Sequence, residues 1–239
     1  MINVAISQPR YLPACNYIHR MLLSDIFVYL DIVKYSPRDW ENRNKVKLNN
    51  GKWSWMSVPV INKGREQLIK DTMLYNEEKW ALKHLKMITY SYSKAKYFNR
   101  YINFFEDTYN EKWNYLQDLN IHIINFIVKE LKIKCKFIKA SDLDVSGKGQ
   151  NLLIDICKKV GGDLYISGPL GKNYIRQDVF EKKNIELFYH NYNHPIYPQI
   201  HGEFLSYMSI IDLLFNCGED SLKYLKKENV EKDEIKEGK

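Results

Sequence analysis

Three histidines gather in the segment 189–204, which reads YHNYNHPIYPQIHGEF. An imidazole titrates near neutral pH, so it can both accept and release a proton during a reaction. The spacing of His190, His194 and His201 matches no metal-binding motif, and no neighbouring carboxylate completes a ligand set. We therefore predict no metal site and take His194 as a candidate general acid or base.

The segment ISQPRYLP at residues 6–13 holds a second set of polar side chains between two prolines. Proline fixes its own φ near about −65°, which limits the directions in which Gln8, Arg10 and Tyr11 are presented. We expect these three side chains to bind a ligand, and the alternative is a rigid structural turn. If they bind a ligand, replacing Gln8 or Tyr11 by alanine weakens binding and leaves folding nearly intact.

Two further segments point to phosphate binding. In YISGPLGKNYI, at 165–175, glycines at a strand end leave backbone N–H groups free to face an anion. In CNYIHRM, at 15–21, His19 opens a helix after a strand, as in the H-x-G-H signature of nucleotidyltransferases, with Asn16 and Ile18 in place of the first His and the Gly. The alternatives are a plain strand-to-helix turn and an ordinary histidine at a helix start.

The elements that position these residues alternate between strands and helices. Apolar strands separated by helices of this length favour parallel pairing with right-handed crossovers. The fold class is therefore α/β, with a mainly parallel sheet built from Rossmann-like βαβ units. We predict strands at 4–8, 26–31, 135–141, 163–168 and 185–191, and helices at 14–23, 151–162, 173–183 and 205–218.

Two insertions interrupt this alternation. Alternating apolar and polar residues around Asn50-Gly51 predict a β-hairpin near 45–60, with Trp53 and Trp55 on one face. These tryptophans either cover a core, which we favour, or stack on a ligand.

Helical periodicity predicts a helical stretch over 76–131, which starts after a capping Asn76 and includes helices at 101–109 and 111–131. We expect one α/β domain over 1–218, and a charged, solvated tail over 219–239.

Composition and net charge limit which classes of protein and which binding partners fit this sequence. The chain has 239 residues and a net charge of +7, and residues 34–100 carry fifteen Lys or Arg against six Asp or Glu. Such a surplus attracts phosphate-bearing ligands or RNA, although biased codon composition explains it equally well. Four isolated cysteines suggest neither a zinc site nor a disulfide framework. Without a signal sequence or a membrane span, we expect a cytoplasmic protein with no membrane partner.

The unusual segments coincide with the expected strand ends. In an open α/β sheet, ligands bind beyond the carboxyl ends of the strands. The rule selects 8–11, 31–35, 141–146, 167–172 and 190–199. We expect these loops to form the walls of one pocket.

Several segments in the same order resemble the WbqC-like family. They are ISQPRYLPACNYIHRM, DIFVYLDIVKYSPRDWENRNKVK, WSWMSVPV, YISGPLGKNY, NHPIYPQ and SIIDLLFNCG, which together run from residue 4 to about 218. The chain departs from the family pattern at 14–16, where a bulky aromatic residue and a glycine are usual. The motif positions map onto Gln8, Pro9, Tyr11, Pro13, Asp31, Tyr35, Asn42, Arg43, Ser167, Gly168, Tyr174, His194, Pro195, Tyr197 and Gln199.

The resemblance implies a role in bacterial surface polysaccharide biosynthesis, including the O-antigen of lipopolysaccharide. It implies an amide-forming transferase that moves an aminoacyl group, such as glycine, onto a nucleotide-linked amino sugar. The cofactor stays open, because the donor is either formed with ATP or arrives preactivated, for example as a charged tRNA. The alternatives are a nucleotidyltransferase-like adenylating enzyme and a non-catalytic protein that binds a sugar nucleotide.

For the transferase we assign four kinds of role. The assignments are Arg43 with Lys34 or Lys172 for phosphate; Asn42, Gln8 and Gln199 for sugar hydroxyls; His194 or Asp31 for proton removal; and Arg10, Tyr11, Tyr35, Ser167, Gly168, Tyr174 and Tyr197 for further substrate contacts. His19 is the catalytic candidate of the nucleotidyltransferase alternative.

Overall fold

A five-stranded parallel sheet forms the centre of the computed structural model, which describes residues 1–61, 64 and 66–236. The strand order is β5-β2-β1-β6-β7, and each neighbouring pair is parallel. The strands are β1 (Asn3–Ser7), β2 (Ile26–Tyr29), β5 (Lys136–Lys139), β6 (Leu164–Ser167) and β7 (Glu186–Tyr189). The predicted α/β class with a mainly parallel sheet is confirmed.

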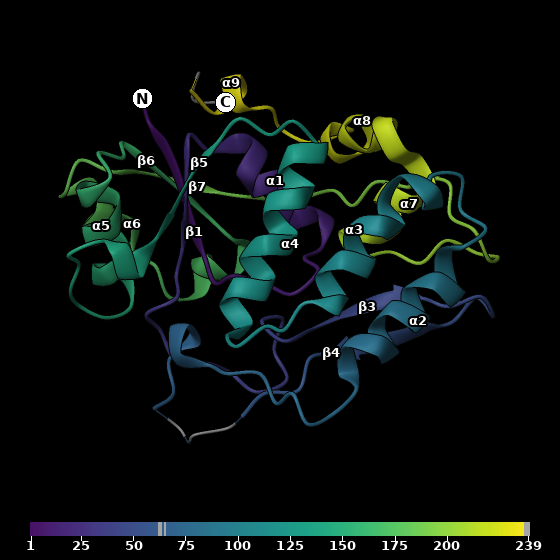
Figure 1. Cartoon of the computed structure of the whole chain (residues 1–239). Helices are drawn as coiled ribbons and strands as arrows, with labels where there is room; N and C mark the ends of the chain where they lie inside the picture. The colour runs from purple at the N-terminus through teal and green to yellow at the C-terminus, as the bar shows by residue number, and fades with distance from the viewer. Residues whose placement is uncertain (62–63, 65, 237–239) are drawn as a thin grey trace.

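Helices cover both faces of this sheet (Figure 1). Because neighbouring residues of a strand point to opposite faces, Ala5 and Phe27 pack in one core and Val4 and Val28 in the other. The first core is shared with α1 (Cys15–Leu23), α4 (Leu116–Glu130) and α7 (Ile210–Cys217), and the second with α5 (Gln150–Lys159) and α6 (Gln177–Glu181).

The strand order reverses between β1 and β6. From β1 the chain passes through α1 to β2 on one side, whereas β6 joins the other side of β1 much later in the sequence. Loops that leave two such strands diverge, which opens a crevice at their carboxyl ends. By this rule the end of β1 is the candidate place for a ligand site.

The predicted hairpin is present as β3 (Arg43–Lys47) and β4 (Trp53–Ser57), followed by α2 (Trp80–Tyr92) and α3 (Phe98–Asn110). Its buried face carries Val46 and Met56, both fully buried. Trp53 lies on the opposite face and is 45% exposed. The favoured interpretation of this residue as core is therefore wrong.

Several helix boundaries differ from the expected ones. The helix expected from 111 starts at Leu116, because the amide of Leu116 donates to the carbonyl of Thr72 and residues before it form an extended connection. The helix expected after Asn76 starts at Trp80, and the Asn76 side chain instead donates to the carbonyl of Trp113 at 2.9 Å. Hydrogen bonds to segments distant in the sequence set where these two helices begin. The prediction used local capping rules, which do not include such bonds.

The expected solvated tail is partly folded onto the domain. It contains α8 (Ser221–Lys226) and α9 (Lys232–Lys236), in which Leu225 is fully buried and Ile235 is 4% exposed. Lys232 also pairs with Asp25 at 2.6 Å. Residues 237–239 lie outside the described residues. Short 3-10 helices complete the chain: η1 (Ile69–Asp71), η2 (Ala140–Asp142), η3 (Pro169–Asn173) and η4 (Gly218–Asp220).

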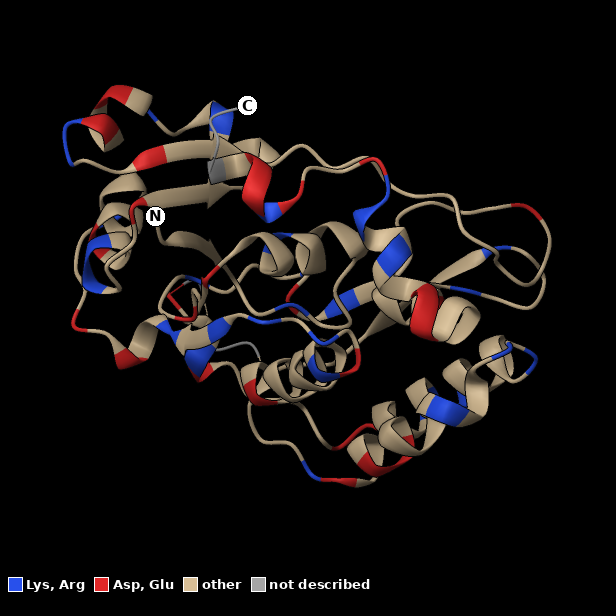
Figure 2. Cartoon of the chain, turned by 90° about the horizontal axis from the view of Figure 1, so that it is seen from above, with Lys and Arg blue, Asp and Glu red and all other residues tan. Residues whose placement is uncertain are grey.

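Charged residues of both signs are spread along the ribbon (Figure 2). The basic surplus of the sequence is therefore dispersed over several elements. Within the described residues, no helix combines the length and the apolar composition needed to span a membrane.

We predict that Gly218→Ala lowers the free energy of unfolding by about 2–4 kcal/mol. Gly218 ends α7 with φ +53°, and a Cβ at this position would overlap the ring of Tyr97. Gly202→Ala is the matched control, because Gly202 has φ +82° but a Cβ added there would have no atom within 4 Å. The control therefore carries only the backbone cost of about 1 kcal/mol. Equal losses for both variants in urea unfolding would contradict the steric argument.

Candidate functional site

A buried arginine lies beside the carboxyl ends of β1 and β6. Arg20 on α1 is 8% exposed, and its Nη2 donates to Ser7 Oγ over 3.1 Å. Among the described residues, no carboxylate forms an ion pair with it. Burial, with the charge of Arg10 in second place, lowers the pKa of Arg20 to about 10, so the group stays cationic at neutral pH. A buried cation without an anionic partner is costly, and a bound anion would offset that cost.

Two guanidinium groups and a glycine surround this position. The guanidinium carbons of Arg10 and Arg20 lie 5.5 and 5.7 Å from the centre of the Tyr17 ring. Gly168, directly after β6, is so close that a Cβ on it would stand 3.4 Å from Nη1 of Arg20. Tyr174 is 59% exposed, and Arg10 is half-buried. The cluster around Arg20 therefore reaches solvent on the side of Tyr174 and Arg10. The arrangement suits a phosphate or diphosphate.

His19 and His190 form a buried neutral pair beside the crevice. Nδ1 of His19 and Nε2 of His190 are 2.9 Å apart, and the residues are 1% and 2% exposed. Burial lowers their pKa values to about 4 and about 3, so both imidazoles are uncharged at pH 7. The sequence predicted His19 at the start of the helix after β1, but His19 is the fifth residue of α1, and a neutral, enclosed ring does not serve as a phosphate-binding cation.

Glu41 forms a second group of functional interest. The residue is 4% exposed, and its Oε2 has no hydrogen-bond partner among the described residues. Burial raises the pKa of Glu41 to about 7; a hydrogen bond from its own backbone amide opposes the rise, Asp39 adds to it, and Arg10 opposes it. Arg10 therefore acts electrostatically on both Arg20 and Glu41, and it links the two groups.

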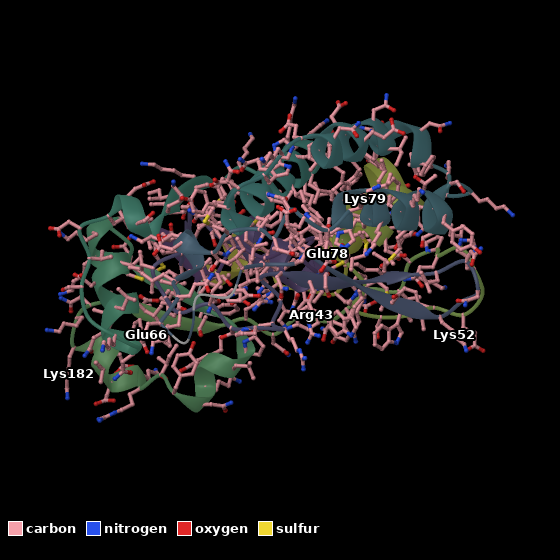
Figure 3. All side chains as sticks on the ribbon, turned by 60° about the horizontal axis from the view of Figure 1, so that its bottom comes forward. Arg43, Lys52, Glu66, Glu78, Lys79 and Lys182 are labelled. Atoms are coloured by element: carbon pink, nitrogen blue, oxygen red, sulfur yellow. The ribbon has the colours of Figure 1, made fainter. Side chains whose placement is uncertain are left out.

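Three expected site residues lie near Glu41. Tyr35 is 8% exposed, and burial, with Glu41 next, raises its pKa to about 12. Asn42 donates its Nδ2 to the carbonyl of Val58 at 3.0 Å. Arg43 stacks on Trp55, with 4.1 Å between the guanidinium carbon and the ring centre, and lies on the face turned forward in Figure 3.

The hairpin surface next to Arg43 is rich in aromatic and basic side chains. Lys45 lies 4.3 Å from the Trp53 ring centre, and the Trp40 and Trp55 rings are 5.6 Å apart. Such a face stacks on flat or apolar ligand groups while its cations meet phosphate.

The first loop is held by the core. Tyr11 has no exposed area, and its hydroxyl bonds to Nδ1 of His84 at 2.8 Å and to the Tyr109 hydroxyl. Asn44 donates to the carbonyl of Leu12 at 2.6 Å. The expectation that Tyr11→Ala leaves folding nearly intact is wrong on this geometry, because the change removes a buried ring and two buried hydrogen bonds. Tyr11 is a positioning residue for Gln8 and Arg10.

Asp31 and Lys34 are occupied by local contacts. Asp31 is fully buried, and its two carboxylate oxygens accept from the amide and hydroxyl of Ser141 at 2.9 and 2.6 Å. Lys34 pairs on the surface with Glu66 at 2.7 Å. Asp31 thereby joins the ends of β2 and β5. None of these contacts connects Asp31 or Lys34 to Arg20.

Beyond His190, the expected site residues of the segment 190–199 are occupied by contacts within the protein. His194 is held on both nitrogens, since Nδ1 donates to the carbonyl of Pro195 and Nε2 accepts from the amide of Tyr207, each at 3.0 Å. Tyr197 and Gln199 donate to Asp212 at 2.9 and 2.7 Å. Asp212 is itself fully buried on α7. These side chains hold the segment against α7.

The remaining expected residues lie around the β6 end. Ser167 is fully buried and donates to the carbonyl of Gly168 at 3.1 Å. Lys172 is exposed, with its Nζ 5.6 Å from the Tyr189 ring centre. Gln8 is half-buried, and its backbone carbonyl accepts from the Tyr17 hydroxyl at 3.0 Å. The structure thus groups Gln8, Arg10, Ser167, Gly168 and Tyr174 near Arg20.

Sequence reasoning missed Arg20, Ser7 and Glu41. Arg20 follows His19 in the first helix, where every third or fourth residue returns to the sheet. Glu41 lies in DWENRN, between Trp40 and the expected Asn42. The helical position of Arg20 was a usable signal, whereas the burial of Glu41 depends on elements distant in the sequence.

Comparisons with known proteins agree with the resemblance found in the sequence. The sequence model of the WbqC-like protein family matches residues 8–224. A protein of Mycobacterium tuberculosis strain H37Rv, described as the uncharacterised protein Rv1507c, is 31% identical over 229 residues, which cover 95% of this chain and 98% of that protein. No solved structure matches the chain.

We predict that Glu41→Gln removes a pH-dependent loss of stability. Because the pKa of Glu41 is raised from 4.5 to about 7, folding favours its protonated form. The penalty is absent below pH 4.5, grows as the pH rises, and is complete above about pH 7. Relative to Glu41→Gln, the wild-type protein should lose about 2–3 kcal/mol of unfolding free energy across this window. Urea unfolding at several pH values checks this, and parallel pH profiles for the two proteins would contradict it.

Proposed function

Since this chain belongs to the WbqC-like protein family, we propose that it transfers an aminoacyl group, such as glycyl, onto the amine of a nucleotide-linked amino sugar. The product belongs to surface polysaccharide or O-antigen synthesis in the cytoplasm. The observation that carries the proposal is Arg20, a buried cation at the strand-order reversal with no carboxylate partner in the described chain. A diphosphate supplies the missing negative charge.

The residues around Arg20 determine the orientation of the bound nucleotide sugar in this proposal. Arg20 and Arg10 bind the diphosphate, with Ser7 and Gly168 at its base. Because Asn120 bonds to the carbonyls of both Pro9 and Glu41, the segment that begins at Glu41 lies beside the first loop, and the sugar beyond the diphosphate extends toward Glu41, Asn42 and Arg43. Gln8, half-buried at the end of β1, orients a sugar hydroxyl.

An acyl group must be activated before an amine can displace its leaving group. The donor is an acyl adenylate formed with ATP, a thioester or a charged tRNA, and each supplies a good leaving group. The hairpin face, on which Trp53 is exposed and Trp55, Arg43 and Lys45 are half-buried, favours the tRNA, because its rings can stack on bases near cations.

The two alternatives differ from this proposal in their residues and in turnover. Adenylation by a nucleotidyltransferase mechanism needs His19 at the phosphates, and the burial and neutrality of His19 oppose that role. A non-catalytic protein would bind the same sugar nucleotide at Arg20 and release it unchanged. Pyrophosphate exchange tests the first alternative, and product formation tests the second.

The direct experiment supplies a dTDP-4-amino sugar with labelled glycine and ATP, and separately with glycyl-tRNA. Formation of a labelled amide supports the proposal, and the productive donor identifies the activated species. Binding of the sugar nucleotide without amide formation from either donor or from a glycyl thioester would favour the non-catalytic alternative.

We predict that Arg20→Gln weakens binding of dTDP about 10- to 100-fold, because it removes the charge-assisted bonds to phosphate. Arg100→Gln is the control, since Arg100 is an exposed arginine that pairs with Glu219 at 2.6 Å and Glu130 at 3.4 Å. Isothermal titration calorimetry measures both variants, and urea unfolding verifies that both are folded. Unchanged dTDP affinity in folded Arg20→Gln would refute the assigned phosphate site.

A further inference from the structure

Three buried hydrogen-bond acceptors without partners belong to neighbouring residues beside the first loop. They are Oε2 of Glu41, Oδ1 of Asn42 and Oδ1 of Asn120, each without a donor among the described residues. A buried polar atom normally has a partner, so a group of unmet acceptors indicates a missing donor. A ligand that offers several N–H donors would satisfy them together.

Hydrogen bonds fix the orientation of both amides. Asn120 on α4 donates its Nδ2 to the carbonyls of Glu41 at 2.8 Å and Pro9 at 3.1 Å. Asn42 donates its Nδ2 to the carbonyl of Val58 at 3.0 Å. Rotating either amide to present a donor at the other end would break these bonds, so Oδ1 remains an acceptor.

The same bonds bring separate segments together. Asn120 holds α4 against both the first loop and the residues that precede β3. The charged and titratable groups that act on Glu41 are Arg10 in the first loop and Asp39 in its own segment. Tyr17 of α1 and Tyr35 after β2 also sense its charge. Arg10 is the half-buried member and lies on the side of the phosphate site.

We infer that Glu41, Asn42 and Asn120 bind the protonated amine of the acceptor sugar, and that Glu41 then removes a proton from it. This inference rests on the proposed function and extends it to the reacting end of the substrate. A primary ammonium carries three N–H donors and a positive charge, which match two amide oxygens and a carboxylate. A hydroxyl at the same position offers one donor and no charge.

The proton has to leave because an ammonium nitrogen has no free electron pair. The ammonium gives one proton to the Glu41 carboxylate, and the neutral amine attacks the acyl carbon of an activated ester, thioester or mixed anhydride. The C–N bond forms, and the bond to the leaving group breaks with its electron pair. The second proton passes to the leaving group, so the products are the amide and the protonated leaving group. The pKa of Glu41 near 7 allows the carboxyl to take a proton and return it to solvent.

His194 and Asp31, the residues expected to remove the proton, are less suited to that role than Glu41. His194 uses both nitrogens within its own segment, and Asp31 accepts two bonds from Ser141. Glu41 retains an oxygen without a partner in the described structure.

The test measures binding of three probes: dTDP, a dTDP-4-amino sugar and the matching 4-hydroxy sugar nucleotide. Wild-type protein at pH 8 should bind the amino sugar about tenfold or more tightly than the hydroxy sugar. Glu41→Gln should reduce that preference to about threefold or less while dTDP affinity stays unchanged. Glu78→Gln is the control, because Glu78 is an exposed acid that precedes α2 and pairs with Lys83 at 3.9 Å.

The outcomes separate this inference from the proposed function. If dTDP binds but wild-type protein shows no preference for the amino sugar, the acceptors are filled by water and the inference fails, while the phosphate site stands. If dTDP does not bind, the proposed function fails, and the melting temperature with free glucosamine, glucose and N-acetylglucosamine decides about the amine site. A shift specific to glucosamine that is lost in Glu41→Gln supports the inference, and equal shifts for all three sugars overturn it.

Discussion

The charge of Arg20 is the constraint on which the candidate site depends. Its guanidinium is taken out of water at the end of β1, with Ser7 Oγ as a neutral acceptor and a second cation, Arg10, nearby. Such a position is destabilising for the protein alone and becomes favourable when an anion enters. Arg20 lies where the parallel sheet reverses its strand order between β1 and β6, the position at which open α/β sheets commonly bind ligands.

Much of the remaining polar structure serves to hold the loops around this charge. Tyr11, Asn44 and Asn120 tie the first loop to α2, α3, the hairpin and α4 through buried hydrogen bonds. Asp212 performs the same task for the segment after β7. Several polar residues that resemble ligand contacts in the sequence therefore hold the loops in place through buried hydrogen bonds. Arg10 and Gln8 remain as half-buried side chains of the first loop.

The site combines two opposite electrostatic environments at its ends. Arg20 and Arg10 favour an anion, whereas Glu41 and the neighbouring amide oxygens favour a cation. A nucleotide-linked amino sugar carries both charges on one molecule, with phosphate at one end and an ammonium at the other. Burial strengthens both preferences, because charges interact more strongly when water is excluded.

The sequence by itself determined the α/β class, the hairpin at Asn50-Gly51, the strand ends and the family, since these follow from local periodicity, turn chemistry and ordered motifs. It also marked Gln8, Arg10 and Gly168 as residues that follow strands. Only the tertiary structure decided that Tyr11 and His194 are internally bonded and that, among the described residues, Arg20 forms no ion pair and Glu41 Oε2 has no hydrogen-bond partner. Burial and partners are set by segments far apart in the chain, and these contacts leave no signal in local spacing.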